Sequence, residues 1–469
     1  MRRIRIGAAR RLLAMACFAL TALAASPSLA ATKIQHLVTP GGIEAWFVQD
    51  ATVPLVAMEY AFAGGATQDP ADKPGVGYMV ASLLDEGAAD LDSKTFHERL
   101  DRHAIELSFT IERDRLRGSL RMLKEHSNEA FGLLRLALTA PRFDTSDVER
   151  IRSQIMSNLR RNSTNPDALA GRNFLKLAFG DHPYGHPSHG TLESIPTIKT
   201  DDLRTYVHHV LARDKLKIAV VGDIEPAALA KLLDQTFGGL PAKGDLTPVA
   251  DVVAAKPPQR VFVPLDVPQT VVMFGGPGIM RHDPDFMAAY VDNHILGGGS
   301  LSSRLYREIR EKRGLAYSVS ESLLWMDHSA LFAGTTGTRA DRASESIEAI
   351  DKEIQRFADS GPTQKELDEA KSYLKGSQML ELDTSSKLAR GLLQYQTDNL
   401  PIDYIEKRNA IVDAVTLDQA RAVAKRLWGH GLLTVVVGRT QAATQPAAAQ
   451  PGAAARPGAA QPAPHPAAH

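Results

Sequence analysis

Residues 200–222, TDDLRTYVHHVLARDKLKIAVVG, contain a helical stretch that leads into an apolar strand ending at Gly222. Residues 416–438, TLDQARAVAKRLWGHGLLTVVVG, repeat the same order, and Gly438 ends the second strand. The opening threonines are 216 residues apart, and so are the closing glycines (416 − 200 = 216 and 438 − 222 = 216). This equal spacing predicts an internal duplication with a unit of about 200 residues.

A second pair of matching segments lies near the start of each half. In both copies an apolar strand runs into a glycine pair and then into Asp-Pro, which supports duplication over coincidence. The two sets are residues 55–62, Gly64-Gly65 and Asp69-Pro70, and residues 271–274, Gly275-Gly276 and Asp283-Pro284.

The order of elements within each half predicts the fold class. Strands come first, and residues 121–138, 145–161 and 344–358 then have apolar side chains at helical spacing. No glycine-rich phosphate loop follows a strand, which favours α+β over a doubly wound sheet. We therefore expect two homologous domains, each an antiparallel-rich sheet packed with helices, facing each other across a cleft. The expected segments are 1–30 (signal peptide), 31–243 (first domain), 244–259 (linker), 260–440 (second domain) and 441–469 (disordered tail).

The first 30 residues resemble a secretory signal. They contain five arginines and no acid, an apolar run at residues 12–25, and small residues at 28–30. The run is too short to span a bilayer and no other stretch is longer, so we expect export to a bacterial periplasm with no stable membrane anchor. Cys17, the only cysteine, lies inside this segment. The mature chain would then have no disulfide, thiolate metal site or cysteine nucleophile.

The charge balance argues against a nucleic-acid-binding protein. The chain has 54 basic and 54 acidic residues, and removing the five arginines leaves 49 against 54, a net charge of −5. A mildly acidic chain without a basic block is a poor binder of nucleic acids.

Residues 441–469 contain 13 alanines and 6 prolines, a composition typical of a disordered tail.

Two further motifs, together with the duplication, point to a known protein family. Residues 182–187, HPYGHP, precede Gly190-Thr191, and residues 303–317 read SRLYREIREKRGLAY. With the two homologous halves, these motifs resemble the pitrilysin/insulinase family of zinc metallopeptidases, and in particular its mitochondrial-processing-peptidase-like bacterial branch. The resemblance covers essentially all of residues 31–440.

Active members of that family carry H-x-x-E-H on a helix of the first half, with two zinc-binding histidines and a glutamate that activates water. The corresponding stretch here is residues 75–88, GVGYMVASLLDEGA, in which Tyr78 and Ser82 replace the histidines and Ala81 replaces the glutamate. A further glutamate ligand of the family corresponds to Asn158. Because these four degenerate positions offer neither a useful ligand set nor a base, we expect no metal in this chain and zinc in a partner subunit.

A relocated metal site is the next alternative. His182, His186 and His189 follow the spacing H-x3-H-x2-H, and Asp181 adjoins them. They could form a replacement zinc site or belong to a Pro/Gly-rich surface loop. We favour the surface loop, because no glutamate that could act as acid or base lies close by in the sequence.

The second half retains one pair of functional residues that the resemblance implies. In active members an arginine and a tyrosine, seven residues apart, reach the substrate and the reacting carbonyl, and Arg310 and Tyr317 match them (317 − 310 = 7). Without the resemblance, Arg310 would be one charge in a solvated run and Tyr317 a strand aromatic. Strand-like residues 61–67 and 331–338 could also bind an extended peptide by strand addition.

The resulting prediction is a non-catalytic subunit of a heterodimeric zinc peptidase. Arg310 and Tyr317 would act on a peptide, or on an unstructured protein, held at the zinc site of a catalytically active homologous subunit. One alternative is a structural or peptide-binding protein with no part in proteolysis. Another is an enzyme that is active alone through relocated residues.

Overall fold

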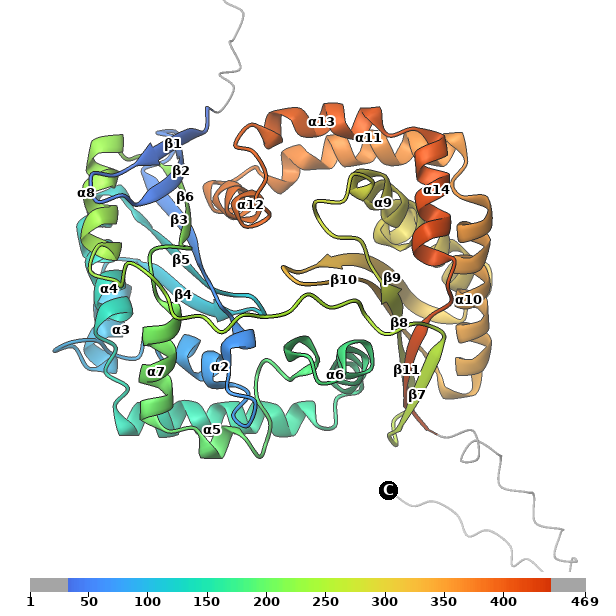
Figure 1. The fold of residues 1–469 in the computed structure, drawn as a ribbon, viewed down its shortest axis with the longest axis horizontal. Helices are drawn as coiled ribbons and strands as arrows, with labels where there is room; N and C mark the ends of the chain where they lie inside the picture. Colours follow the sequence, from blue (N-terminus) through green and yellow to red (C-terminus); the bar gives the residue numbers. More distant parts are fainter. Residues whose placement is uncertain (1–32, 440–469) are drawn as a thin grey trace, which may run out of the picture.

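The computed structural model describes residues 33–439, and Figure 1 shows two halves side by side, each with its own sheet. The predicted signal peptide, residues 1–30, and the predicted tail, residues 441–469, lie outside the described residues. Within residues 33–439, no helix has the length and apolar character needed to cross a membrane.

The first half contains a six-stranded sheet in the order β1-β2-β6-β3-β5-β4, in which β2 and β6 are parallel and the other neighbours are antiparallel. Its strands are β1 (Gln35–Val38), β2 (Glu44–Gln49), β3 (Leu55–Ala63), β4 (Glu106–Ile111), β5 (Arg115–Leu123) and β6 (Lys217–Gly222). Its helices are α2 (Val76–Ala81), α3 (Ser93–Arg102), α4 (Ser127–Thr139), α5 (Thr145–Asn162), α6 (Pro166–Phe179), α7 (Thr200–Val210) and α8 (Pro226–Phe237).

The second half contains a five-stranded sheet in the order β7-β11-β8-β10-β9, in which only β7 and β11 are parallel. Its strands are β7 (Gln259–Pro264), β8 (Gln269–Pro277), β9 (Ala316–Trp325), β10 (Ala330–Arg339) and β11 (Leu433–Gly438). Its helices are α9 (Phe286–Asn293), α10 (Ala343–Ser360), α11 (Gln364–Glu381), α12 (Ser385–Thr397), α13 (Tyr404–Ala414) and α14 (Leu417–Trp428).

The two sheets have the same topology. Strands β2, β6, β3, β5 and β4 of the first sheet correspond in order to β7, β11, β8, β10 and β9 of the second. The helix pairs α4/α10, α5/α11, α6/α12 and α7/α14 also follow one another in the same order along the chain. The predicted α+β class and the internal duplication are confirmed.

One expectation about local structure was wrong, and another was wrong in part. Residues 121–138 do not form one helix, because β5 continues to Leu123 and α4 begins at Ser127. Buried and exposed side chains alternate along β5, which is the period of a strand. Residues 331–338 lie in β10, which is paired with β8 and β9 and leaves no free edge for strand addition there. Of residues 61–67, Ala61 is paired on both sides, Phe62 and Ala63 pair only with β5, and residues 64–67 lie beyond the end of β3.

Each half covers the other half's sheet with one helix. Helix α12 packs Ala389, Leu392 and Leu393 on β2, β3 and β6 of the first sheet. Helix α6 packs residues such as Leu169 and Phe174 on β8, β10 and β11 of the second sheet. Figure 1 shows both helices in the space between the two sheets. Burying each such leucine or phenylalanine contributes about 1.5–3 kcal/mol, so the exchanged helices bind the halves together.

A buried tyrosine forms a polar junction between the halves. Tyr184, within the HPYGHP motif, is fully buried, and its hydroxyl donates to both carboxylate oxygens of Asp114 at 2.8 and 2.9 Å. The same hydroxyl accepts the backbone N–H of His328, at 3.0 Å, and the backbone N–H of Asp327 donates to Asp114. The motif is therefore not the surface loop that we expected from its glycines and prolines.

The chain between α8 and β7 runs along this junction without helix or strand. Within it, the backbone N–H of Val252 donates to His328, and the N–H of Ala255 donates to Ala178 at the end of α6. Asp251 pairs with the ring of His328 at 2.9 Å. This segment therefore contacts both halves along its length.

We predict that Tyr184→Phe lowers the free energy of unfolding by about 1–3 kcal/mol, because Asp114 and the N–H of His328 lose a buried partner. Chemical denaturation of the full chain measures the change. The matched control is Tyr373→Phe, since Tyr373 is 60% exposed and should tolerate loss of its hydroxyl. Equal stability of the two variants would contradict a stabilising role for the junction.

Candidate functional site

Helix α2 carries Tyr78 and Ala81, Ser82 directly follows it, and contacts to its backbone hold it in place. The carboxylate of Asp69, from the repeated Asp-Pro signal, accepts the N–H groups of Gly75 at 2.6 Å and Gly77 at 2.8 Å. Gly75 has φ +101°, and a Cβ there would lie 2.7 Å from the Cα of Gly190. Only glycine allows this approach, so the start of α2 packs directly on the loop that follows the HPYGHP motif.

The side chains at the degenerate positions do not form a zinc site. The ring of Tyr78 contacts the ring of His189, with 4.3 Å between their centroids. Ser82 donates its hydroxyl proton to the backbone oxygen of Tyr78 at 2.8 Å, and Ala81 is buried. On α5, Asn158 accepts a hydrogen bond from Arg161. This donor set lacks the imidazole, carboxylate and thiolate ligands that zinc requires, so it does not fit the metal.

The three histidines of the relocated-site hypothesis have separate partners. The ring of His182 contacts the backbone oxygen of Ala250 at 2.9 Å and accepts the N–H of Tyr184. His189 packs on Tyr78, and Asp181 pairs with Lys176 at 2.7 Å. Within residues 33–439, no three His, Cys, Asp or Glu side chains are placed to hold a metal ion.

Arg310 and Tyr317, in contrast, are brought together. Arg310 lies on the π-helical turn Tyr306–Glu311, and Tyr317 is the second residue of β9. The guanidinium of Arg310 lies over both rings, 4.8 Å from the centroid of Tyr317 and 4.9 Å from that of Tyr306. Tyr306 also accepts a hydrogen bond from Arg310. Tyr317 is 78% exposed, so its phenol is accessible at the surface.

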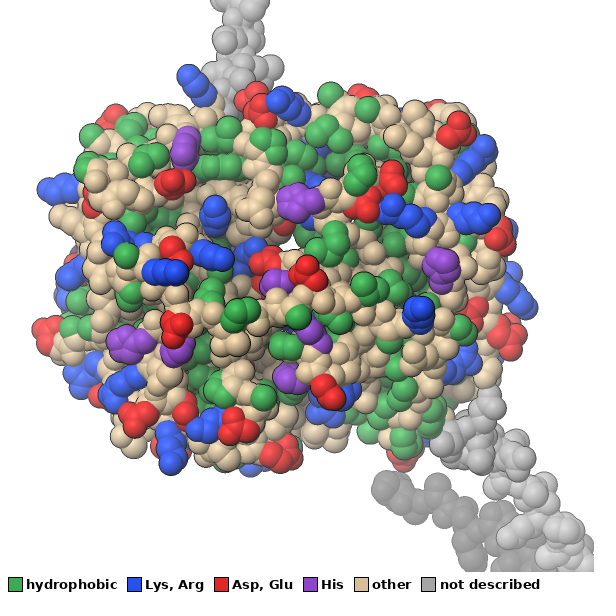
Figure 2. All heavy atoms as spheres, viewed as in Figure 1, with side chains coloured by type: hydrophobic (Ala, Val, Ile, Leu, Met, Phe, Trp, Pro, Cys, Tyr) green, Lys and Arg blue, Asp and Glu red, His purple; other side chains and the backbone are tan. Residues whose placement is uncertain are grey.

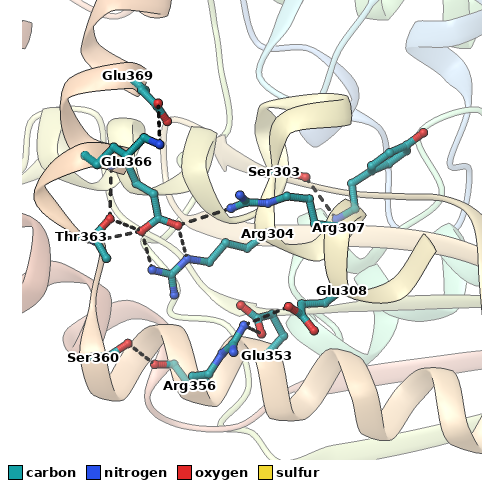
Figure 3. A network of polar contacts seen from close by, with 12 residues as sticks. Ser303, Arg304, Arg307, Glu308, Glu353, Arg356, Ser360, Thr363, Glu366 and Glu369 are labelled. Carbon is teal, nitrogen blue, oxygen red and sulfur yellow. Dashed lines mark hydrogen bonds and ion pairs between the residues drawn. The ribbon is translucent and has the colours of Figure 1, made fainter. Parts of the chain in front are cut away.

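The rest of the segment 303–317 builds the second half. Ser303, Leu305 and Ile309 are fully buried. Arg304 makes a two-pronged contact with Glu366, at 2.8 and 2.6 Å, and Thr363 donates its N–H to the same carboxylate (Figure 3). Although burial opposes it, this network lowers the pKa of Glu366 to about 2. The motif therefore anchors the turn to the start of α11 and leaves Arg310 and Tyr317 at its end.

The sequence predicted a cleft between the halves but not the residues that line the central cavity found there. It has a volume of about 710 Å³ and lies between β5, the end of β9, α12 and the loop that precedes α9. Its charged lining consists of four arginines and four acids, and its apolar lining includes Trp325. The charged residues are Arg113, Arg115, Arg117, Arg281, Glu112, Asp114, Asp327 and Asp398. Figure 2 shows acidic, basic and histidine side chains around a hollow in the middle of the molecule. None of the six site residues expected from the sequence lines this cavity.

Comparison with known families agrees with the duplicated fold. Residues 47–192 match the domain described as insulinase, peptidase family M16, and residues 197–374 match the domain described as the peptidase M16 inactive domain. The chain belongs to the M16 peptidase family. Because it lacks H-x-x-E-H, it is an inactive M16 homologue.

Individual M16 relatives extend this comparison. The chain is 28% identical over 360 residues to a protein named non-peptidase homolog YmxG from Helicobacter pylori, covering 76% of this chain and 83% of that protein. It is 26% identical over 361 residues to the uncharacterized zinc protease YmxG of Bacillus subtilis. The crystal structure of a peptidase M16 inactive domain from Pseudomonas fluorescens aligns with a TM-score of 0.82 at 28% identity, covering 87% of this chain and 98% of that one.

Two buried acids in the second half, among the described residues, make no hydrogen bond of ordinary geometry, although the indole of Trp428 lies near Glu321. Asp292, at the end of α9, and Glu321, on β9, are 0% and 1% exposed. Burial raises the pKa of Asp292 to about 9, although the positive charge of Arg304 lowers it in part. Burial also raises the pKa of Glu321 to about 8, although the indole of Trp428 lowers it in part. Both side chains are therefore protonated in the folded protein near neutral pH.

We predict that these two acids make the fold less stable as pH rises. Their pKa values are higher in the folded chain than in the unfolded chain, so their contribution is complete below about pH 4 and is lost towards about pH 8–9. The slope is at most about 1.4 kcal/mol per pH unit for each group. The stability of Asp292→Asn and Glu321→Gln relative to wild type should therefore increase between about pH 5 and about pH 8.

Chemical denaturation at several pH values measures this difference. Asp90→Asn is the matched control, since Asp90 is exposed and should show a relative stability that does not depend on pH in this range. Parallel pH profiles for all three variants would contradict the prediction.

Proposed function

We propose that this M16 homologue is the non-catalytic subunit of a heterodimeric zinc peptidase. The observation that carries the proposal is the Arg310–Tyr317 pair, which is assembled and accessible in a chain whose own metal positions do not fit zinc. The zinc ion and the catalytic glutamate would belong to an active homologous subunit. The substrate would be a peptide or an unstructured protein segment.

The chemistry of the pair suits a role at a partner's reaction centre. A phenol hydroxyl can donate a hydrogen bond to the oxyanion that forms when water attacks a peptide carbonyl. Contact with the guanidinium fixes the orientation of the Tyr317 ring, and the cation favours negative charge nearby. A guanidinium can also hold a carbonyl or carboxylate of the substrate. These roles require neither a metal nor a base in this chain.

The names of the relatives are those of a family that includes both zinc proteases and homologues without peptidase activity. One relative is named a non-peptidase homolog and another a zinc protease. Pairing of an inactive chain with an active one would give the Arg310–Tyr317 pair a site to act on. We also propose that the pair of subunits works in the periplasm, because residues 1–30 resemble a secretory signal.

A second candidate function is peptide binding without proteolysis. The central cavity of about 710 Å³ favours it, because this cavity lies entirely within the chain and requires no partner. Loss of Arg310 and Tyr317 would then leave peptide binding unchanged.

We predict that the purified mature chain alone retains no stoichiometric zinc after dialysis and hydrolyses no peptide, because Tyr78, Ala81, Ser82 and Asn158 provide neither ligands nor a base. Elemental analysis and a fluorogenic peptide assay test both points. The double variant Tyr78→His, Ser82→His should remain inactive, since Ala81 still supplies no base. Chelator-sensitive hydrolysis by the wild-type chain would refute the prediction.

We predict that Tyr317→Phe lowers the turnover of the mixed complex about a hundredfold, or about 3 kcal/mol, by removing one oxyanion donor. The assay mixes this chain with a homologue that carries an intact H-x-x-E-H, and co-elution checks that assembly is unchanged. Arg310→Ala should raise KM more than it lowers kcat. Lys312→Ala is the matched control, because its exposed ion pair with Glu308 should contribute little. Equal effects of Tyr317→Phe and Lys312→Ala on turnover would contradict a role for Tyr317 in the reaction and would indicate that residues 303–317 are only part of the solvent-exposed surface.

A further inference from the structure

One cation of the central cavity lacks an anionic partner. Arg113 lies in the turn between β4 and β5 and lines the cavity. Burial lowers the pKa of its guanidinium, while Asp114 acts in the opposite direction. Asp114, however, is turned towards the hydroxyl of Tyr184, and Arg113 makes no ion pair with any described carboxylate. Its hydrogen bond to the backbone oxygen of His186 is long, at 3.3 Å.

The other three arginines of the cavity are paired. Arg115 contacts Asp327 at 2.8 Å, Arg117 contacts Glu112 at 2.8 Å, and Arg281 contacts Asp398 at 3.5 Å. Arg115 and Arg117 also donate to the backbone oxygen of Thr397 and the side chain of Gln394 on α12. A desolvated guanidinium without a counter-charge is unfavourable unless an anion occupies its free donors. Arg113 is therefore the cavity cation that is available to an incoming ligand.

The surroundings of Arg113 suit a carboxylate attached to an apolar group. On one side, burial and, to a smaller extent, the positive charge of Arg113 lower the pKa of His189, which favours a neutral imidazole beside this cation. On the cavity side, the lining is apolar at Leu175, Trp325, Met326 and Leu331. The four acids of the lining already have partners: Glu112 pairs with Arg117, Asp327 with Arg115 and Asp398 with Arg281, and Asp114 accepts the hydroxyl of Tyr184. A planar carboxylate can accept two parallel hydrogen bonds from one guanidinium, which gives both affinity and orientation.

We propose that Arg113 binds the carboxylate of a peptide whose adjoining apolar side chain fills the central cavity. The carboxylate would come from the C-terminus of the peptide or from an acidic side chain. This site lies within the chain and does not depend on the proposed role of Arg310 and Tyr317. It would bind peptide whether or not a zinc subunit is present.

The test is calorimetric titration of the full mature chain with three blocked tripeptides. Acetyl-Leu-Leu-Phe with a free C-terminus offers a terminal carboxylate, its C-terminal amide offers none, and acetyl-Leu-Glu-Phe-amide offers only a side-chain carboxylate. We expect at least one acid to bind about tenfold or more tightly than the uncharged amide, because a hydrogen bond to a charged group is worth more than a neutral one. The tighter of the two acids identifies the source of the carboxylate.

Two variants assign the binding to Arg113. Arg113→Gln should abolish the preference for the acid, while Arg117→Gln, which changes a paired arginine of the same cavity, should retain it. Arg113→Gln should melt at or above the temperature of the wild type, because it removes an unpaired cation, so loss of binding would not reflect unfolding. The ring resonances of His189 should shift on addition of the acid and not of the amide.

Three outcomes would overturn the proposal. These are equal affinity for acids and amide, a preference for the acid that survives Arg113→Gln, and no binding of any probe at millimolar concentration. None of them bears on the Arg310–Tyr317 pair, because that role is measured by turnover of the mixed complex.

Discussion

The exchange of one helix between the two halves is the contact on which the rest of the structure depends. Each sheet packs one face on helices of its own half and presents its second apolar face to a helix of the other half. Without α12 and α6, the apolar residues of β6 and β11 would be exposed to water. These two helices therefore fix the distance and orientation of the sheets. The central cavity is lined by Leu175 of α6 and by Gln394 and Thr397 of α12, and Tyr184 packs in the same cluster as α6.

The two halves differ in which of the residues singled out by the family resemblance they contain. The first half keeps the helix that carries the family's zinc motif, but its side chains there pack and bond locally, as Tyr78 does with His189. The second half keeps Arg310 and Tyr317 in contact on a turn anchored by Arg304 and Glu366. Tyr78, Ala81 and Ser82 offer no carboxylate that could accept a proton from water, whereas the guanidinium of Arg310 and the phenol of Tyr317 remain together at the surface.

The duplication, the α+β class and the two domains followed from the sequence because the repeated signals are local and equally spaced. Two expectations failed where tertiary context decides. The apolar spacing around residues 121–138 fits a helix, yet the first part pairs with β3 and β4. The HPYGHP loop has the composition of a surface turn, yet Tyr184 is buried between the halves. The residues that line the cavity were missed because Arg113 and Trp325, for example, come from positions far apart in the chain, which no short pattern connects.

The exchanged helices also constrain how such a chain could have arisen. A single unit of the duplication has a sheet with one uncovered apolar face and a helix that finds no sheet of its own to cover. It could reach a stable fold only by trading that helix with a second copy, which is a symmetric domain swap. Joining two such units in one chain, through the segment before β7, would turn a concentration-dependent encounter into an intramolecular one with a high effective concentration.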